Sequence, residues 1–143
     1  MQNYPALQLF ALSLLALFVK TTLTSLLQIF RRFGSQRFLL PEDARLAGTQ
    51  AVSSESFFVQ RCANVWRNDV ENLPLFLALA LTYVLLGATR ESVSWLFPSY
   101  VLIRYLHTIV YLRGLQPWRA ILYLSGMVVC WIIAAKIIVK ILG

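Results

Sequence analysis

The sequence predicts an all-α integral membrane protein that folds as a bundle of four transmembrane helices. Hydrophobic residues make up 59% of the 143-residue chain and charged residues only 13%, whereas about 25% of an ordinary soluble domain is charged. The mean hydropathy is +0.68. The apolar residues gather in four long runs, each near the ~20 residues that a helix needs to cross a hydrocarbon core about 30 Å thick.

We interpret the chain as a single transmembrane domain, residues 1–143, with spans at about 5–30, 57–88, 93–112 and 118–142. The first run has no basic residue before it, contains Lys20 and lacks a small-residue cleavage site, so we expect a retained helix rather than a signal peptide. The long connection at 31–56 contains Gly34, Pro41 and Gly48 and is expected to form a loop.

The second helix is expected to begin near Ser53, Ser54 or Ser56, each of which can cap a helix. Its first turns are polar, so the helix is longer than its membrane portion. Short links at 87–92 and 114–117 make successive helices antiparallel neighbours. Pro117 suits the start of the fourth helix.

Basic residues define the expected orientation in the membrane. One face receives the larger set of arginines and should be cytoplasmic by the positive-inside rule, in a bacterial inner membrane or the endoplasmic reticulum. This set is Arg31, Arg32, Arg37, Arg45, Arg61, Arg67, Arg113 and Arg119, against Arg90, Lys136 and Lys140 on the other face. The net charge of +7 is therefore explained by topology and anionic lipids, and no nucleic-acid partner is expected.

The sequence offers no expected metal site and no expected disulfide. Cys62 and Cys130 lie far apart, in different predicted spans, and His107 is the single histidine. A metal centre needs a cluster of such ligands. Each cysteine is therefore interpreted as a small packed residue.

Polar residues recur on one face of three predicted helices. A charge inside a membrane span is costly unless it faces a bundle interior, a wet cavity or a partner. The stripe on the second helix is Arg61, Asn64, Asn68 and Glu71, that on the third is Arg104, His107 and Tyr111, and that on the fourth is Arg119 and Tyr123. Arg67 also stands four residues before Glu71, close enough to form an ion pair with it. Cations outnumber carboxylates here, which favours a small anionic ligand. The alternative is that these groups only hold the helices in register.

Several motifs carry a resemblance to a known family. The run VQRCANVWRNDVEN at 59–72 resembles the signature of membrane-associated glutathione transferases and prostaglandin E synthases, the MAPEG family. Pro41-Glu42-Asp43, Arg104-x-x-His107-Thr108-x-x-Tyr111 and Arg119-Ala120-x-x-Tyr123 are similar to further family motifs, in the same order. The resemblance implies a homotrimer of four-helix subunits, with the cosubstrate glutathione bound between neighbours near the cytoplasmic face.

The resemblance also implies roles for individual residues. Glutathione contacts are implied for Arg32, Arg67, Asn68, Glu71, His107, Tyr111, Arg119 and Tyr123. Arg119 is the implied catalytic cation, since a guanidinium can hold a thiol as thiolate. Asp43 matches an aspartate proposed for catalysis, and the alternative is a loop acid paired with Arg45 or Arg119. Arg61 and Arg104 are expected to support the site through internal ion pairs, and His107 could equally be a packed histidine.

We therefore expect a membrane-bound glutathione transferase that acts on lipophilic electrophiles and also reduces lipid hydroperoxides. Ala120, which stands where the prostaglandin branch has serine, favours this activity. The alternatives are an enzyme that makes prostaglandin E or leukotriene C, a non-catalytic lipid-binding scaffold, and a channel or transporter. Retention of Arg119 argues against the scaffold, which has no need of a thiolate-stabilising cation.

Overall fold

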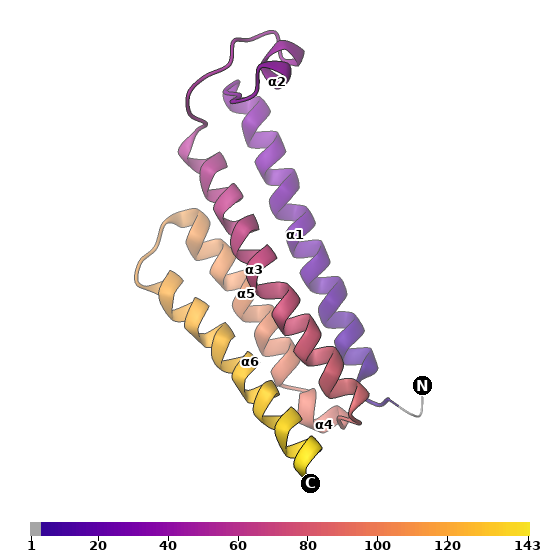
Figure 1. The fold of residues 1–143 in the computed structure, drawn as a ribbon. Coiled ribbons are helices and arrows are strands. Elements are labelled where there is room, and N and C mark those ends of the chain that lie inside the picture. The colour runs from indigo at the N-terminus through magenta and orange to yellow at the C-terminus, as the bar shows by residue number, and fades with distance from the viewer. Residues whose placement is uncertain (1–3) are drawn as a thin grey trace.

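The computed structural model describes residues 4–143, and the regular secondary structure of this part of the chain is all helix, without any strand. Four long helices run side by side along the molecule (Figure 1): α1 (Leu7–Ser35), α3 (Phe57–Leu85), α5 (Leu96–Arg113) and α6 (Trp118–Leu142). The short helices are α2 (Pro41–Leu46) and α4 (Arg90–Val93). The predicted all-α fold is thus confirmed for the described residues.

Contacts between the helices place α3 and α5 at the centre of the bundle. Helix α1 packs against α3 and α5, and α6 packs against the same two helices. Figure 1 shows α4, the start of α1 and the C-terminus at one end of the bundle and the loop with α2 at the other. The turn between α5 and α6 lies towards the α2 end, so the polar starts of α3 and α6 face the same side.

The helix boundaries differ from the predicted spans in three places. Helix α1 continues five residues beyond the predicted end at residue 30, to Ser35. The predicted loop at 31–56 contains helix α2, whose first residue is Pro41. The helix of the predicted third span at 93–112 begins three residues later, at Leu96, because the short helix α4 ends at Val93 and a turn follows it. Ser56, one of the three predicted caps, accepts a hydrogen bond from the Val59 backbone amide.

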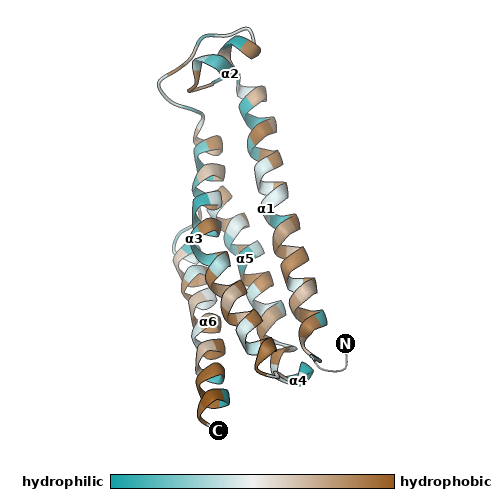
Figure 2. Cartoon of the chain, turned by 45° about the vertical axis from the view of Figure 1, so that its right-hand side comes forward, coloured by the Kyte–Doolittle hydropathy of each residue, from teal (hydrophilic) through white to brown (hydrophobic). Residues whose placement is uncertain are grey.

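Two of the four predicted spans, α1 and α6, are long and apolar enough to cross a membrane. Helices α3 and α5 contain polar and charged residues within their apolar stretches, which lowers their hydropathy. Figure 2 shows this division, with hydrophilic residues gathered on the α2-side halves of α3 and α5. Large apolar side chains on α1 and α6 face outward; Phe18 is 65% exposed and Trp131 is 71% exposed.

The core of the bundle is built from apolar side chains at the α4 end. Phe76 stacks on Tyr100 with ring centroids 3.8 Å apart, and Phe97 meets Phe76 edge-on at 5.9 Å. Leu17 of α1 and Ile133 of α6 complete this core from either side. The polar groups of α3 and α5 lie beyond it, towards the α2 end, where the candidate site is found.

The end of α5 is fixed by Arg61, whose partner differs from the expected one. The Arg61 Nη1 donates a hydrogen bond to the Leu112 carbonyl at 3.0 Å, and no ion pair of Arg61 occurs among residues 4–143. Gly114 ends the helix with φ +71°, and a Cβ there would lie 2.7 Å from Arg61 Nη2. Arg61 therefore supports the site end by capping a helix rather than by pairing with a carboxylate.

We expect Gly114→Ala to destabilise the protein by about 1–2 kcal/mol, because alanine is strained at positive φ and its Cβ displaces Arg61. The measurement is thermal unfolding of the purified protein in detergent. Gly34→Ala is the matched control, since Gly34 lies inside α1 with nothing within 4 Å of an added Cβ. This control should leave the unfolding temperature unchanged or raise it. Equal losses from both variants would contradict the explanation.

Candidate functional site

Polar side chains from three helices meet in a pocket of about 430 Å³ beside the turn between α5 and α6. Each helix contributes residues from the polar stripe predicted on it. The lining consists of Asn68 from α3, His107 and Tyr111 from α5, Gln116 from the turn, and Arg119, Ala120, Tyr123 and Leu124 from α6. The start of α6 thus places its first arginine directly in the wall of the pocket.

Arg119 lies half-buried and is held by neutral groups. Its Cζ lies 4.8 Å from the centroid of the Tyr111 ring, a cation–π contact. One end of the Gln116 amide lies 3.0 Å from Nε and 2.6 Å from Nη2, and we assign the oxygen to this end because a guanidinium has only donors. No ion pair among residues 4–143 includes Arg119. Its charge is therefore fixed in position and remains available to an anion in the pocket.

His107 and Tyr111 form the α5 wall of the pocket. Their rings meet edge-to-face with centroids 5.7 Å apart. His107 is 2% exposed, and its Nδ1 has no hydrogen-bond partner in the described part of the chain. A buried ring nitrogen without a partner is unusual, so a bound ligand or an ordered water is the natural partner for it.

Behind the pocket lies a buried charge cluster, which we define as Lys20, Asp69 and Arg104. Each of the three side chains is 2% exposed. The Lys20 ammonium contacts Asp69 Oδ2, and Arg104 Nη2 lies 2.8 Å from Asp69 Oδ1. Arg104 Nη2 also donates to Asn68 Oδ1 at 2.5 Å. The cluster joins α1, α3 and α5 and carries two positive charges against one negative charge.

Sequence reasoning missed Asp69 as a member of this cluster. It placed Lys20 within the first apolar run and expected an internal ion pair for Arg104, but it named no partner for either and grouped the polar residues of α3 around Asn68 and Glu71. The sequence did contain a signal for a buried Asp69, because this residue follows Cys62 and Val65 at helical spacing on the face of α3 that is buried in the structure. A carboxylate on such a stripe needs a buried cation as partner.

Five of the eight residues implied to contact glutathione line the pocket: Asn68, His107, Tyr111, Arg119 and Tyr123. The other three lie elsewhere on the chain. Arg67 and Glu71 are exposed on α3, and the ion pair predicted between them is not formed in the described residues. Arg32, near the end of α1, lies with its Nε 2.5 Å from Glu55 Oε1.

Asp43 also lies outside the pocket. It occupies the first turn of α2, in the loop beyond the end of α1, and its side chain is half-buried. Neither Arg45 nor Arg119 forms an ion pair with it within residues 4–143. The loop pairings that we considered for this carboxylate are thus not formed in the single chain.

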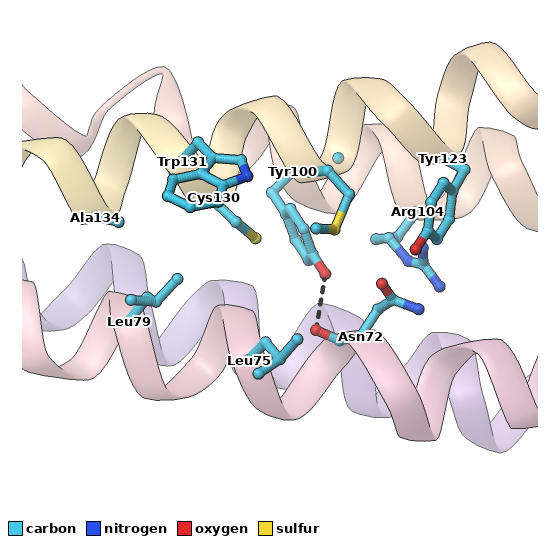
Figure 3. A pocket seen from close by; sticks show the side chains of 11 residues that line it. Asn72, Leu75, Leu79, Tyr100, Arg104, Tyr123, Cys130, Trp131 and Ala134 are labelled. Carbon is cyan, nitrogen blue, oxygen red and sulfur yellow. Dashed lines mark hydrogen bonds between the residues drawn. The ribbon is translucent and has the colours of Figure 1, made fainter.

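A second pocket of about 270 Å³ lies between α3, α5 and α6 and is mostly apolar. Figure 3 shows Arg104, Tyr123 and Asn72 at one end of this pocket and Trp131, Leu79 and Ala134 at the other. Between the two ends, the Tyr100 hydroxyl donates a hydrogen bond to the Asn72 carbonyl at 3.3 Å. Tyr123 lines both pockets. The polar end of the apolar pocket therefore adjoins the pocket that contains Arg119.

Comparison with known proteins gives concordant matches over most of the chain. The model of the MAPEG family matches residues 10–139. Prostaglandin E synthase of Macaca fascicularis is 34% identical over 137 residues, which is 94% of this chain and 89% of the relative. The Homo sapiens protein of the same name is 33% identical over the same shares. Microsomal glutathione S-transferase 1 of Mus musculus is 32% identical over 103 residues, 68% of this chain and 66% of the relative.

Proposed function

The chain belongs to the MAPEG family, and we propose that it is a membrane-bound enzyme that joins the thiolate of glutathione to lipophilic electrophiles. The observation that carries the proposal is Arg119, a fixed cation that lies in the wall of a polar pocket and has no carboxylate partner among residues 4–143. The family match and the two apolar helices α1 and α6 support an integral membrane protein.

The chemistry follows from the charge of Arg119. A free thiol of pKa about 8.5 is mostly protonated at neutral pH, and a nearby guanidinium favours the thiolate by binding its negative charge. The sulfur then supplies the electron pair for a new bond to the electrophilic carbon, whose leaving group departs with its own pair. The proton lost from the thiol passes to solvent. Tyr111 and Tyr123 would orient the ligand beside Arg119.

We further propose that a second and a third copy of the chain complete the site. Arg67 and Glu71 are exposed on α3, and charged side chains within a span are costly in lipid. A homotrimer with four spans per subunit covers this face and brings the charges towards glutathione, at the cytoplasmic side. Glu71 suits the glutathione ammonium, whereas Arg67 and Arg32 suit its carboxylates.

The apolar pocket between α3, α5 and α6 suits the lipophilic second substrate. Its wall carries Trp131 and Leu79 far from the polar pocket, and Tyr123 where the two pockets adjoin. A substrate that enters from the bilayer would place its apolar part there and its reactive carbon near the thiolate. A lipid hydroperoxide in the same position would be reduced to its alcohol and water, while two glutathione molecules are oxidised to one disulfide.

Isomerisation of an endoperoxide to a prostaglandin is the second candidate function. The similarity to prostaglandin E synthases favours it, at 34% and 33% identity over 94% of this chain. Ala120 favours the transferase, since it lines the pocket where the prostaglandin branch has serine. Both functions need the same glutathione pocket. Product analysis with an electrophile, a lipid hydroperoxide and a prostaglandin endoperoxide separates them.

The first experiment is a titration of the detergent-solubilised protein with glutathione, followed by ultraviolet absorbance of the thiolate at neutral pH. We expect saturable thiolate formation in the wild type. Binding without thiolate would instead favour the scaffold. Absence of binding would overturn the proposal.

A further inference from the structure

We propose that Lys20, Asp69 and Arg104 are positioning residues for glutathione, because they fix the Asn68 side chain with its amide nitrogen turned into the pocket. This inference rests on the proposed function and deepens it. Asn68 lines the polar pocket, whereas the three charged residues lie behind it, each 2% exposed. The cluster therefore acts on the ligand through Asn68.

The orientation of the Asn68 amide follows from the chemistry of its neighbour. Arg104 Nη2 lies 2.5 Å from Asn68 Oδ1. A guanidinium has only donors, so the oxygen of the amide must face it and the nitrogen must occupy the other branch. That nitrogen makes no hydrogen bond within residues 4–143 and is free to donate to an acceptor oxygen of the ligand. Asn68 is thereby a donor in the pocket rather than an acceptor.

Arg104 is itself held by one oxygen of the Asp69 carboxylate, whose other oxygen is held by Lys20. Its Nη2 also donates to Asp69 Oδ1 at 2.8 Å, and the other oxygen of Asp69 contacts the Lys20 ammonium. Because both carboxylate oxygens are occupied, Asp69 cannot rotate without breaking a buried ion pair. The hydroxyl of Tyr105 donates to the Ala16 carbonyl at 2.8 Å and adds a second polar tie between α5 and α1. Lys20 of α1 thus holds Asp69, Asp69 holds Arg104, and Arg104 holds the Asn68 side chain.

The backbone beside Asn68 is fixed as well. The Asn72 side chain donates to the Asn68 carbonyl at 2.7 Å, and Asn72 is buried. The only freedom left to Asn68 is thus the rotation of its side chain, and Arg104 removes it. Loss of the bridge would allow the amide to turn, so that its oxygen could face the ligand.

A double-mutant cycle of the full-length protein tests this order of action. The Kd of glutathione is measured by calorimetry for the wild type, Asn68→Ala, Asp69→Asn and the double variant. Each single change should raise Kd about tenfold, by loss of one oriented hydrogen bond to a charged ligand. The double variant should show the same tenfold rise, because Asp69 acts only through Asn68. A rise of about a hundredfold in the double variant would overturn the proposal.

Further variants separate positioning from a general effect on folding. Arg104→Lys keeps a positive charge near Asp69 but lacks Nη2, the atom that reaches both Asp69 and Asn68, so it should raise Kd about as much as Asp69→Asn and serves if that variant does not fold. Thr24→Val is the matched control, since the buried Thr24 hydroxyl bonds only to the Lys20 carbonyl of its own helix. It should leave Kd unchanged. In turnover assays Asp69→Asn should raise the KM for glutathione and leave the KM for an aryl halide probe unchanged, because Asp69 lines neither the polar nor the apolar pocket.

The outcomes also distinguish this inference from the function on which it rests. If the wild type binds glutathione and both Asp69→Asn and Arg104→Lys bind it equally well, the positioning role is wrong and the proposed function stands. If the wild type shows no binding, both fall together. If Thr24→Val weakens binding as much as Arg104→Lys, the cluster acts through the packing of α1 and the positioning role is again overturned.

Discussion

Replacement of Arg119 by alanine is expected to lower kcat about 100- to 1,000-fold, the usual effect of removing one fixed group that stabilises developing negative charge. Arg119 lies in the pocket wall, and its partners in the described part of the chain are neutral: the Tyr111 ring and the Gln116 amide. Its charge is therefore available to the glutathione sulfur. Turnover of an electrophile and the ultraviolet absorbance of bound thiolate should fall together, because both depend on the same charge.

Arg113→Ala is the matched control for this prediction. Arg113 is an exposed arginine in the last turn of α5, near the same end of the bundle, but it does not line the pocket. Its removal changes the net charge equally and should leave kcat and thiolate absorbance almost unchanged. If both variants lose activity to the same degree, the effect comes from the overall potential of this face. If neither does, Arg119 is not the activating cation.

The fold was predictable because it follows from local features of the sequence, namely the length of each apolar run and the residues that begin or end a helix. The four runs, the Ser56 cap and Pro117 can each be read from short segments. Helix α2 and the break between α4 and α5 were not anticipated. Short helices of this kind depend on contacts of a few residues, such as the Thr89 side chain that accepts from the Ser92 amide, and leave no long periodic pattern.

The candidate site was predictable only in part, because helical spacing gives the face of a residue but not its partner. Spacing grouped His107 with Tyr111, and the structure places both in the pocket with Arg119. It also grouped Glu71 with Arg67, yet these two stay exposed and unpaired within the described chain. Exposed pairs of this kind gain little from contact. A partner from another helix, such as Lys20 for Asp69, depends on the tertiary arrangement.

The largest stability effect is expected for Asp69→Ala, which leaves the buried Lys20 and Arg104 without their carboxylate. Breaking a buried ion pair by removing one partner typically costs about 3–5 kcal/mol, a large share of the ~5–15 kcal/mol that stabilises an ordinary domain. Most of the variant should therefore unfold or aggregate on extraction. Size-exclusion profiles and thermal unfolding in detergent measure this loss. Glu91→Ala, at an exposed position of α4 outside the proposed site, should change stability by less than about 0.5 kcal/mol.

Replacing all three charged residues by apolar ones separates the effect of the cluster on stability from its effect on glutathione binding. The triple variant Lys20→Met, Asp69→Leu and Arg104→Met removes all three buried charges together, and buried ion pairs are often replaced by apolar residues without loss of stability. We expect it to unfold at or above the wild-type temperature while it binds glutathione about tenfold more weakly, since Asn68 then lacks Arg104 as its partner. A triple variant that is as unstable as Asp69→Ala would show that the cluster is retained for stability, whereas wild-type affinity would show that Asn68 needs no support.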